Sequence, residues 1–155
     1  MRRAARLSCI LLANKIECCL VSYREIEFQV HGDQQGSLVA LEGCKDIPFQ
    51  IKRVYYIYGT QREIVRGKHA HKDLEQVIIC VSGSCDFIVD DGAGKKTFKL
   101  DRPNKGLYVG DNVWREFTNF SGDCVVVVLA NQAYTPDDYI KDYELFKKEI
   151  GKAAK

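Results

Sequence analysis

Short runs of β-branched and aromatic residues alternate with turn residues along most of the chain after Ser22. Seven of these runs are bounded by Gly, Asp, Asn or Pro, which is the pattern of strands joined by tight turns. Most intervals between the runs are too short for the helix that joins parallel strands. The pattern therefore predicts an all-β fold, an antiparallel sandwich or barrel. The runs cover residues 36–43, 51–59, 75–83, 85–92, 95–100, 106–110 and 124–130.

The last part of the chain, TPDDYIKDYELFKKEIG, has the periodicity of a helix. Thr135 is a suitable N-cap, Pro136 fits the first helical position, and the two aspartates that follow favour the positive end of the helix dipole. The sequence therefore predicts one C-terminal α-helix that ends near Gly151. Its apolar face should pack against the barrel and consists of Tyr139, Tyr143, Phe146 and Ile150.

Residues 1–21 differ from the rest of the chain because they combine a basic start with an apolar run. Asn14, Lys15 and Glu17 interrupt that run, which leaves it too short to span a bilayer. A cleavable signal peptide is an alternative, but we expect an N-terminal extension that is disordered or artificial in origin. The remaining residues, 22–150, have the length of one domain.

Charge and cysteine content restrict the partners and the compartment. The chain has 23 basic and 21 acidic residues, a net charge of +2, and no long block of one sign. This balance argues against nucleic acid or a membrane surface as a partner. The odd count of seven cysteines, some of them in apolar runs, favours free thiols in a reducing compartment, the cytoplasm. Cys18 and Cys19 lack a second pair at zinc-binding spacing.

Two of the three histidines lie one residue apart in RGKHAHKDLEQ, just before an apolar run. In a strand, alternation places His69 and His71 on the same face, directed at whatever the sheet encloses. Two imidazoles at one cavity suggest a metal site or a proton-transfer pair. The alternative is a pair of surface histidines at a strand edge.

The order of four residues resembles the first metal-binding motif of the cupin superfamily, a small double-stranded β-helix: His69, His71, Glu75 and Gly83. The segment GDNVWREFTN resembles the second motif, but Arg115 stands where the fourth ligand should be. A guanidinium is always protonated and cannot bind a metal ion. His31, the only other histidine, lies in an expected turn. We therefore expect no metal, with a metal-dependent cupin oxygenase as an alternative.

Two imidazoles, a carboxylate and an arginine suit the removal of a proton next to a carbonyl group. A neutral histidine acts as the base, a second group moves the hydroxyl proton, and a cation stabilises the enolate oxygen. The ordinary histidine pKa of about 6.5 allows the imidazole to accept and return a proton near neutrality. Metal-free proton transfer is therefore the leading chemistry.

Several segments together resemble the thymidine-diphosphate-sugar 3,4-ketoisomerases, in the same order from about Tyr23 to Ile150. They are GSLVALE, IPFQIKRVYYIY, RGKHAHKDLEQVIICVSGSC, GLYVGDNVWREF, CVVVVLA and DDYIKDYELFKKEI. The resemblance implies a cupin jelly-roll barrel, a homodimer with exchanged N-terminal strands, and conversion of dTDP-4-keto-6-deoxy-D-glucose to its 3-keto isomer without a cofactor. It also implies a PLP-dependent aminotransferase as the next enzyme, toward 3-amino-3,6-dideoxy sugars of O-antigen lipopolysaccharide or of antibiotics.

The resemblance also implies roles for individual residues. His69 and His71 are the expected catalytic pair, with His71 as the base at C3 and His69 as its partner, and the reverse assignment stays open. The expected substrate-binding residues are Arg53, Tyr55, Arg66, Arg115 and Gln35. Three aromatic residues are candidates for stacking on thymine or for the core: Tyr58, Tyr108 and Trp114.

Two of these positions bear on the configuration that C4 acquires. Family members with arginine at the position of Gln35 and histidine at that of Arg115 resemble the galacto-producing group. An arginine is a very poor proton donor, so we expect protonation from the other face and a gluco-configured product. Two further alternatives are a dTDP-sugar 3,5-epimerase and a non-catalytic cupin that binds nucleotide sugars.

Overall fold

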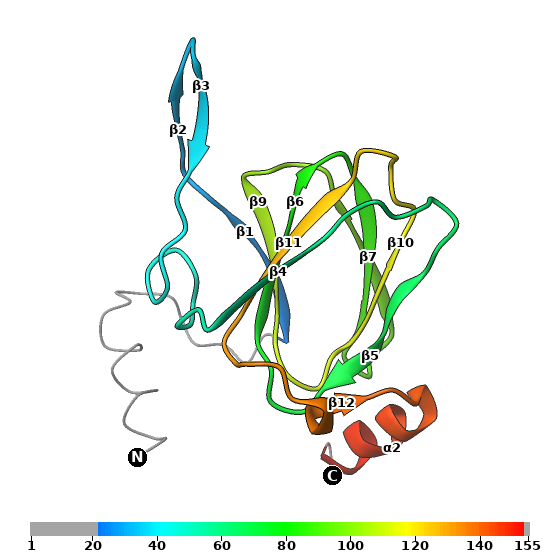
Figure 1. Ribbon diagram of the computed structural model, residues 1–155. Helices are drawn as coiled ribbons and strands as arrows, with labels where there is room; N and C mark the ends of the chain where they lie inside the picture. Colours follow the sequence, from blue (N-terminus) through cyan, green and yellow to red (C-terminus); the bar gives the residue numbers. More distant parts are fainter. Residues whose placement is uncertain (1–21, 154–155) are drawn as a thin grey trace.

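The computed structural model describes residues 22–153 and consists mainly of two antiparallel sheets, which face each other as the walls of a barrel (Figure 1). The first sheet has the order β1 (Tyr23–Glu27), β9 (Lys105–Val109), β6 (Gln76–Ser82), β11 (Val125–Ala130) and β4 (Arg53–Ile57). The second has the order β12 (Tyr139–Ile140), β5 (Arg66–His71), β10 (Trp114–Thr118), β7 (Cys85–Asp90) and β8 (Lys95–Leu100). The expected all-β cupin barrel is confirmed.

A separate two-stranded sheet, the hairpin of β2 (Val30–Asp33) and β3 (Gly36–Val39), projects away from the barrel (Figure 1). His31, which we expected in a turn, lies in β2. Each of the seven runs predicted as strands overlaps a strand of the structure. The expected N-terminal extension, residues 1–21, lies outside the described part of the chain.

Strand β6 is buried on both faces, which explains its uninterrupted apolar sequence. Ile78 and Cys80 belong to the core between the two sheets. Val77 and Ile79 face the opposite way, where apolar side chains of the segment 26–51 cover them. Because the space between the sheets is filled in this way, any polar side chain that faces inward needs an internal partner.

The C-terminal segment is not the single helix expected from Thr135 onward. Pro136–Asp138 form a 3₁₀ turn, β12 follows as a short strand beside β5, and helix α2 covers Tyr143–Ala153. The carboxylate of Asp138 accounts for the difference, because it accepts the backbone N–H groups of Lys72 and Asp73 at 3.1 and 2.9 Å. These tertiary contacts outweigh the local helix propensity.

Helix α2 has a different cap from the expected one. Asp142 Oδ1 accepts the backbone N–H of Leu145 at 2.8 Å, whereas Thr135 makes no side-chain capping bond. The apolar face is confirmed for the residues that lie on α2, and it packs against the outer side of the second sheet: Tyr143, Phe146 and Ile150. No helix within residues 22–153 is long and apolar enough to cross a membrane.

The expectation of free thiols is confirmed for three cysteines and wrong for a fourth. Cys80, Cys85 and Cys124 are free and buried in the barrel. Cys44, in the segment outside the first sheet, is disulfide-bonded. The other cysteines, at positions 9, 18 and 19, lie outside the described residues.

Candidate active site

A β-bulge in β5 positions the two histidines. Gly67 and Lys68 have positive φ angles of 88 and 52°, and the pairing of β5 with β10 shifts by one residue there. A side chain at position 67 would lie 2.8 Å from the carbonyl oxygen of Arg115, so this position requires glycine. Beyond the bulge, regular alternation places His69 and His71 on the same face, as expected.

The two imidazoles contact each other directly. The Nε2 atoms of His69 and His71 are 3.0 Å apart, and the rings meet edge to face with centroids 4.7 Å apart. The Nδ1 atom of His69 lies 3.0 Å from the carbonyl oxygen of Gly67. Since a carbonyl oxygen only accepts, this Nδ1 carries a hydrogen. His69 is partly exposed, whereas His71 is buried.

Two residues of the C-terminal segment complete the surroundings of the pair, and the sequence analysis missed both as site residues. Asp138 Oδ2 lies 2.6 Å from His71 Nδ1. The ring of Tyr139 packs on both histidines, with centroid distances of 4.8 Å to His69 and 4.4 Å to His71. Tyr139 therefore lies on β12 at the site, and its expected place on the apolar face of a helix is wrong.

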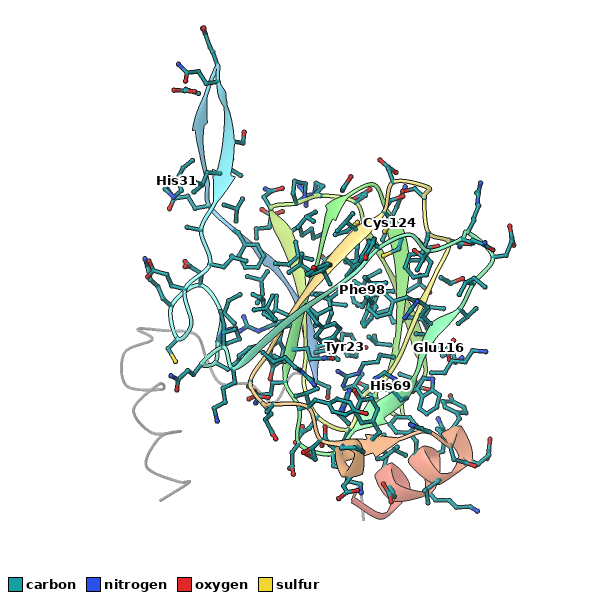
Figure 2. The ribbon with its side chains drawn as sticks, viewed as in Figure 1. Tyr23, His31, His69, Phe98, Glu116 and Cys124 are labelled. Carbon is teal, nitrogen blue, oxygen red and sulfur yellow. The ribbon has the colours of Figure 1, made fainter. Side chains whose placement is uncertain are left out.

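Glu75, the carboxylate expected beside the histidines, is engaged elsewhere. Tyr108 Oη and Asn131 Nδ2 each donate to its carboxylate at 2.7 Å. Because Glu75 is engaged elsewhere and Arg115 stands where the fourth ligand would be, these residues do not fit a cupin metal centre. Within the described residues, the one cluster of possible metal ligands consists of the three thiols of Cys80, Cys85 and Cys124. The label of Cys124 in Figure 2 lies at the end of the barrel away from His69.

Arg115 is a buried cation held by neutral acceptors. Its side chain is 2% exposed and donates to Gln76 Oε1 at 2.5 Å and to the carbonyl oxygens of Gly110 and Val113 at 2.8 to 3.2 Å. Burial lowers the pKa of Arg115 to about 10, so the guanidinium is still charged at neutral pH. The structure thus places a fixed positive charge behind the histidines.

Burial and this charge act on the histidines in the same direction. Burial lowers the pKa of His69 to about 4, and Arg115 and Lys141 add to the effect. Burial also lowers the pKa of His71, with Arg115, His69 and Arg53 as further causes, whereas the carboxylate of Asp138, 2.6 Å from its Nδ1, favours a proton on this ring. A state in which both imidazoles are charged is therefore strongly disfavoured.

Arg53 and Tyr55 lie on the inner side of β4. The guanidinium of Arg53 lies 5.4 Å from the ring of Tyr55 and 5.8 Å from the ring of Tyr134. Tyr55 Oη accepts a hydrogen bond from Gln76 Nε2 at 2.8 Å, which links this strand to Arg115. The Nε atom of Arg53 is buried and has no hydrogen-bond partner among residues 22–153.

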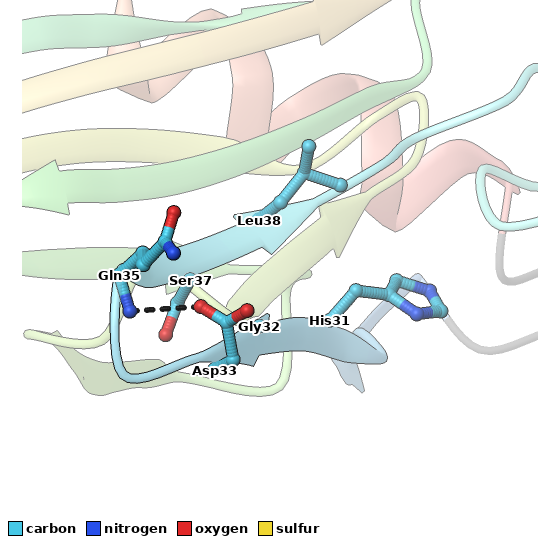
Figure 3. Close-up of a pocket in the computed structure, with 7 residues that line it drawn as sticks. His31, Gly32, Asp33, Gln35, Ser37 and Leu38 are labelled. Carbon is cyan, nitrogen blue, oxygen red and sulfur yellow. Dashed lines mark hydrogen bonds between the residues drawn. The ribbon is translucent and has the colours of Figure 1, made fainter.

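The other two expected binding residues are farther from the pair. Arg66 is exposed at the first position of β5, where it pairs with Phe117. Gln35 lies in the turn of the β2–β3 hairpin, and its backbone N–H donates to Asp33 at 2.8 Å (Figure 3). The hairpin encloses a shallow hollow of about 380 Å³ but extends away from β5. Within one chain, Gln35 is not brought to the histidines.

The three aromatic candidates for thymine stacking have different surroundings. Trp114 packs under α2, with its ring centroid 5.0 Å from that of Tyr143. Tyr108 donates to Glu75 on the first sheet and packs in its outer cluster. Tyr58 is 67% exposed. Trp114 and Tyr108 thus have the core role that was the alternative.

Comparisons with known proteins agree with this geometry. The profile of a family described as FdtA, WxcM-like, C-terminal, matches residues 21–151. A TDP-4-oxo-6-deoxy-alpha-D-glucose-3,4-oxoisomerase of Aneurinibacillus thermoaerophilus is 54% identical over 127 residues, which are 82% of this chain and 91% of that protein.

Two solved structures are similar in fold and in sequence. One is a mutant of the 3,4-ketoisomerase QdtA of Thermoanaerobacterium thermosaccharolyticum in complex with TDP-4-keto-6-deoxyglucose, with a TM-score of 0.83, 41% identity, and coverage of 86% of this chain and 97% of that one. The other is the TDP-quinovose 3,4-ketoisomerase WlaRB of Campylobacter jejuni, with a TM-score of 0.79, 47% identity, and coverage of 81% and 97%.

Proposed function

The chain belongs to the FdtA family of WxcM-like C-terminal proteins and is a sugar-nucleotide 3,4-ketoisomerase, and on this basis we propose that it converts dTDP-4-keto-6-deoxy-D-glucose to dTDP-3-keto-6-deoxy-D-glucose. The observation that carries the proposal is the imidazole pair, with Nε2 atoms 3.0 Å apart. The reaction moves hydrogen from C3 to C4 through an enediol, which requires a base and an acid that then exchange roles. Two adjacent imidazoles supply both.

We assign the base at C3 to His69, which reverses the order expected from the sequence. His69 is the more exposed of the two, and its Nδ1–H is held by Gly67, so the lone pair that can act as a base is on Nε2. His69 takes the C3 proton while O4 is protonated, which gives the enediol. Loss of the O3 proton and return of a proton to C4 then give the 3-keto product, and His71 moves the hydroxyl protons.

Arg53 is the group we propose for the diphosphate. Its buried Nε has no acceptor within the described part of the chain, and a guanidinium binds phosphate oxygens through two parallel bonds. The rings of Tyr55 and Tyr134 hold the guanidinium in place through cation–π contacts. Arg66, exposed at the start of β5, is a second cation for the same group.

The state of Arg115 supports the gluco configuration proposed for the product. Its N–H groups are directed at Gln76 and at backbone carbonyls, and its guanidinium stays charged, so this side of the site has no acid to protonate C4. The 47% identity with a TDP-quinovose 3,4-ketoisomerase agrees, because quinovose has the gluco configuration.

We also propose a homodimer in which the β2–β3 hairpin packs on a second copy. A free two-stranded hairpin is marginally stable in water, and nearly all of its side chains are exposed here. The edge strand β4 has exposed apolar side chains as well, Val54 at 56% and Tyr56 at 66%. Such an exchange would carry Gln35 toward the site of the partner. The 3-keto product suits a PLP-dependent aminotransferase as the next enzyme.

The test is proton NMR of dTDP-4-keto-6-deoxy-D-glucose with chelator-treated protein in deuterated buffer, beside His69→Asn and His71→Asn. We expect a new 3-keto species with deuterium at C4, gluco coupling constants, and two inactive variants. Deuterium at C5 as well would indicate a 3,5-epimerase, and binding without exchange would indicate a non-catalytic module. Activity that is lost with the chelator and restored by iron would contradict a metal-free reaction.

The C4 configuration has its own test. Replacing Arg115 with His and Gln35 with Arg should place an acid on the other face and shift the product toward galacto, as seen in the C4 coupling constants. A folded, active double variant whose product keeps the gluco configuration at C4 would contradict this role of Arg115.

A further inference from the structure

The three contacts along the line Asp138, His71, His69, Gly67 require three hydrogens. They join Asp138 Oδ2 to His71 Nδ1 at 2.6 Å, the two Nε2 atoms at 3.0 Å, and His69 Nδ1 to the Gly67 oxygen at 3.0 Å. Each contact needs one hydrogen between its two atoms. Two neutral imidazoles carry one each, and the carbonyl carries none. One more proton must therefore reside on the three side chains.

The charges around the pair limit the number of added protons to one. With one added proton and the negative charge of Asp138, the three side chains have a net charge of zero. The other charged groups that act on the imidazoles are cations, Arg115, Arg53 and Lys141, so they disfavour a further proton. Without the carboxylate, even the first added proton would face these cations with no compensating charge in a buried site.

We propose that Asp138 is a positioning residue that keeps one added proton on the histidine pair, so that His71 starts the reaction as the acid and His69 as the base. This inference rests on the proposed ketoisomerase function. Two further contacts fix the carboxylate, since its Oδ1 atom accepts the backbone N–H groups of Lys72 and Asp73. The 3₁₀ turn that replaces the expected helix thus serves to hold Oδ2 against His71.

The proton balance of the reaction fits a pair that holds one added proton. His69 removes the proton from C3, and His71 gives its Nε2 proton to O4, so the enediol forms while the pair keeps one added proton. In the second half, neutral His71 accepts the proton of the O3 hydroxyl and His69 returns a proton to C4. Each imidazole ends as it began, and Asp138 keeps its charge throughout.

Asp138→Asn is a sharp test because the amide fits the same contacts. The two backbone N–H groups require its oxygen on their side, which leaves the Nδ2–H to donate to His71 Nδ1. His71 then carries its hydrogen on Nε2 and donates to His69, so all three contacts persist without an added proton. We expect a folded variant with nearly unchanged KM and a kcat lowered by about 100-fold or more.

Long-range proton–nitrogen NMR spectra of the imidazoles report the proton count itself. At pH 7.5 the wild-type protein should show one added proton and a protonated Nδ1 on His71, and Asp138→Asn should show two neutral rings with His71 protonated on Nε2. The control is Asp137→Asn, which removes an adjacent, exposed carboxylate and should change neither the spectra nor kcat.

The outcomes test the proposed function and the role of Asp138 separately. A wild-type protein that does not isomerise the sugar would refute the proposed function, whatever the spectra show. An active wild type with two neutral rings, or an Asp138→Asn variant with full kcat, would overturn only the role of Asp138. Partial recovery of kcat in Asp138→Glu, with the added proton restored in the spectra, would support that role over a purely structural one.

Discussion

The two ends of the barrel share strand β6 but carry opposite kinds of side chain. At one end, polar residues of β5, β6 and β10 are buried and bond to one another or to neighbouring carbonyls: His71, Gln76 and Arg115. At the other end, three thiols pack together, with Cys80 Sγ 3.7 Å from Cys124 Sγ. Ser84 and Ser121 join the two turns beside those thiols, because each backbone N–H donates to the other residue.

Strand β6 connects the two ends and shows what the difference means. On the same face it carries Gln76 at the histidine end, Ile78 in the middle and Cys80 at the thiol end. The apolar and thiol positions contribute the burial that stabilises the barrel. The polar positions need partners to offset their desolvation and mainly fix geometry. Activity and stability should therefore be separable by substitutions at opposite ends.

Substitutions at the histidine end should have the largest effect, and on activity alone. His69→Asn or His71→Asn removes a proton-transfer group, so we expect kcat to fall by about 10² to 10⁴. The free energy of unfolding should change by about 1 kcal/mol or less, because an amide replaces part of the hydrogen bonding. Progress curves by NMR and urea unfolding of each variant measure the two quantities. A large loss of stability in both variants would contradict the division.

The thiol half of the barrel should show the reverse. Phe87 is fully buried and its ring lies 4.5 Å from that of Phe117. Phe87→Ala should lower the free energy of unfolding by about 3 to 5 kcal/mol. The kcat of the folded variant, measured well below its melting temperature, should stay within about twofold of the wild-type value. The buried Cys80 should not react with thiol reagents under those conditions, which checks that the protein is folded. A kcat that falls in proportion to stability would show that the two ends are coupled.

The features that could be predicted from the sequence are those that depend on residues close together in the chain. Alternation with period two predicted the strands and placed His69 and His71 on one face, because both depend on near neighbours. Asp138 lies 67 residues from His71 in the chain, and its local sequence favours a helix start, so only the tertiary fold brings the two together. Gln35 is a different case, because within one chain its hairpin points away from the site.

Lowering the pH should lower the free energy of unfolding, because His69 binds a proton less readily in the folded protein. Burial lowers the pKa of His69 from its ordinary value of 6.5 to about 4. Between these values the unfolded chain binds more protons than the folded protein, so the free energy of unfolding falls as pH falls. We expect a loss on the order of 2 kcal/mol by pH 4 from this group. Urea unfolding at several pH values measures it. His69→Asn should flatten that part of the curve, and an identical curve in the variant would assign the loss elsewhere.

The smallest predicted effect concerns the segment that carries Asp138 to the histidines. Asp142 caps α2 through the N–H of Leu145, whereas Thr135 makes no side-chain capping bond. Asp142→Ala should therefore lower the free energy of unfolding by about 1 kcal/mol, and Thr135→Ala should change it by less than about 0.5 kcal/mol. Paired urea unfolding curves can resolve this difference. A larger loss in Thr135→Ala than in Asp142→Ala would place the start of the helix at Thr135. Asp138 would then lie within a helix, away from the backbone N–H groups of Lys72 and Asp73.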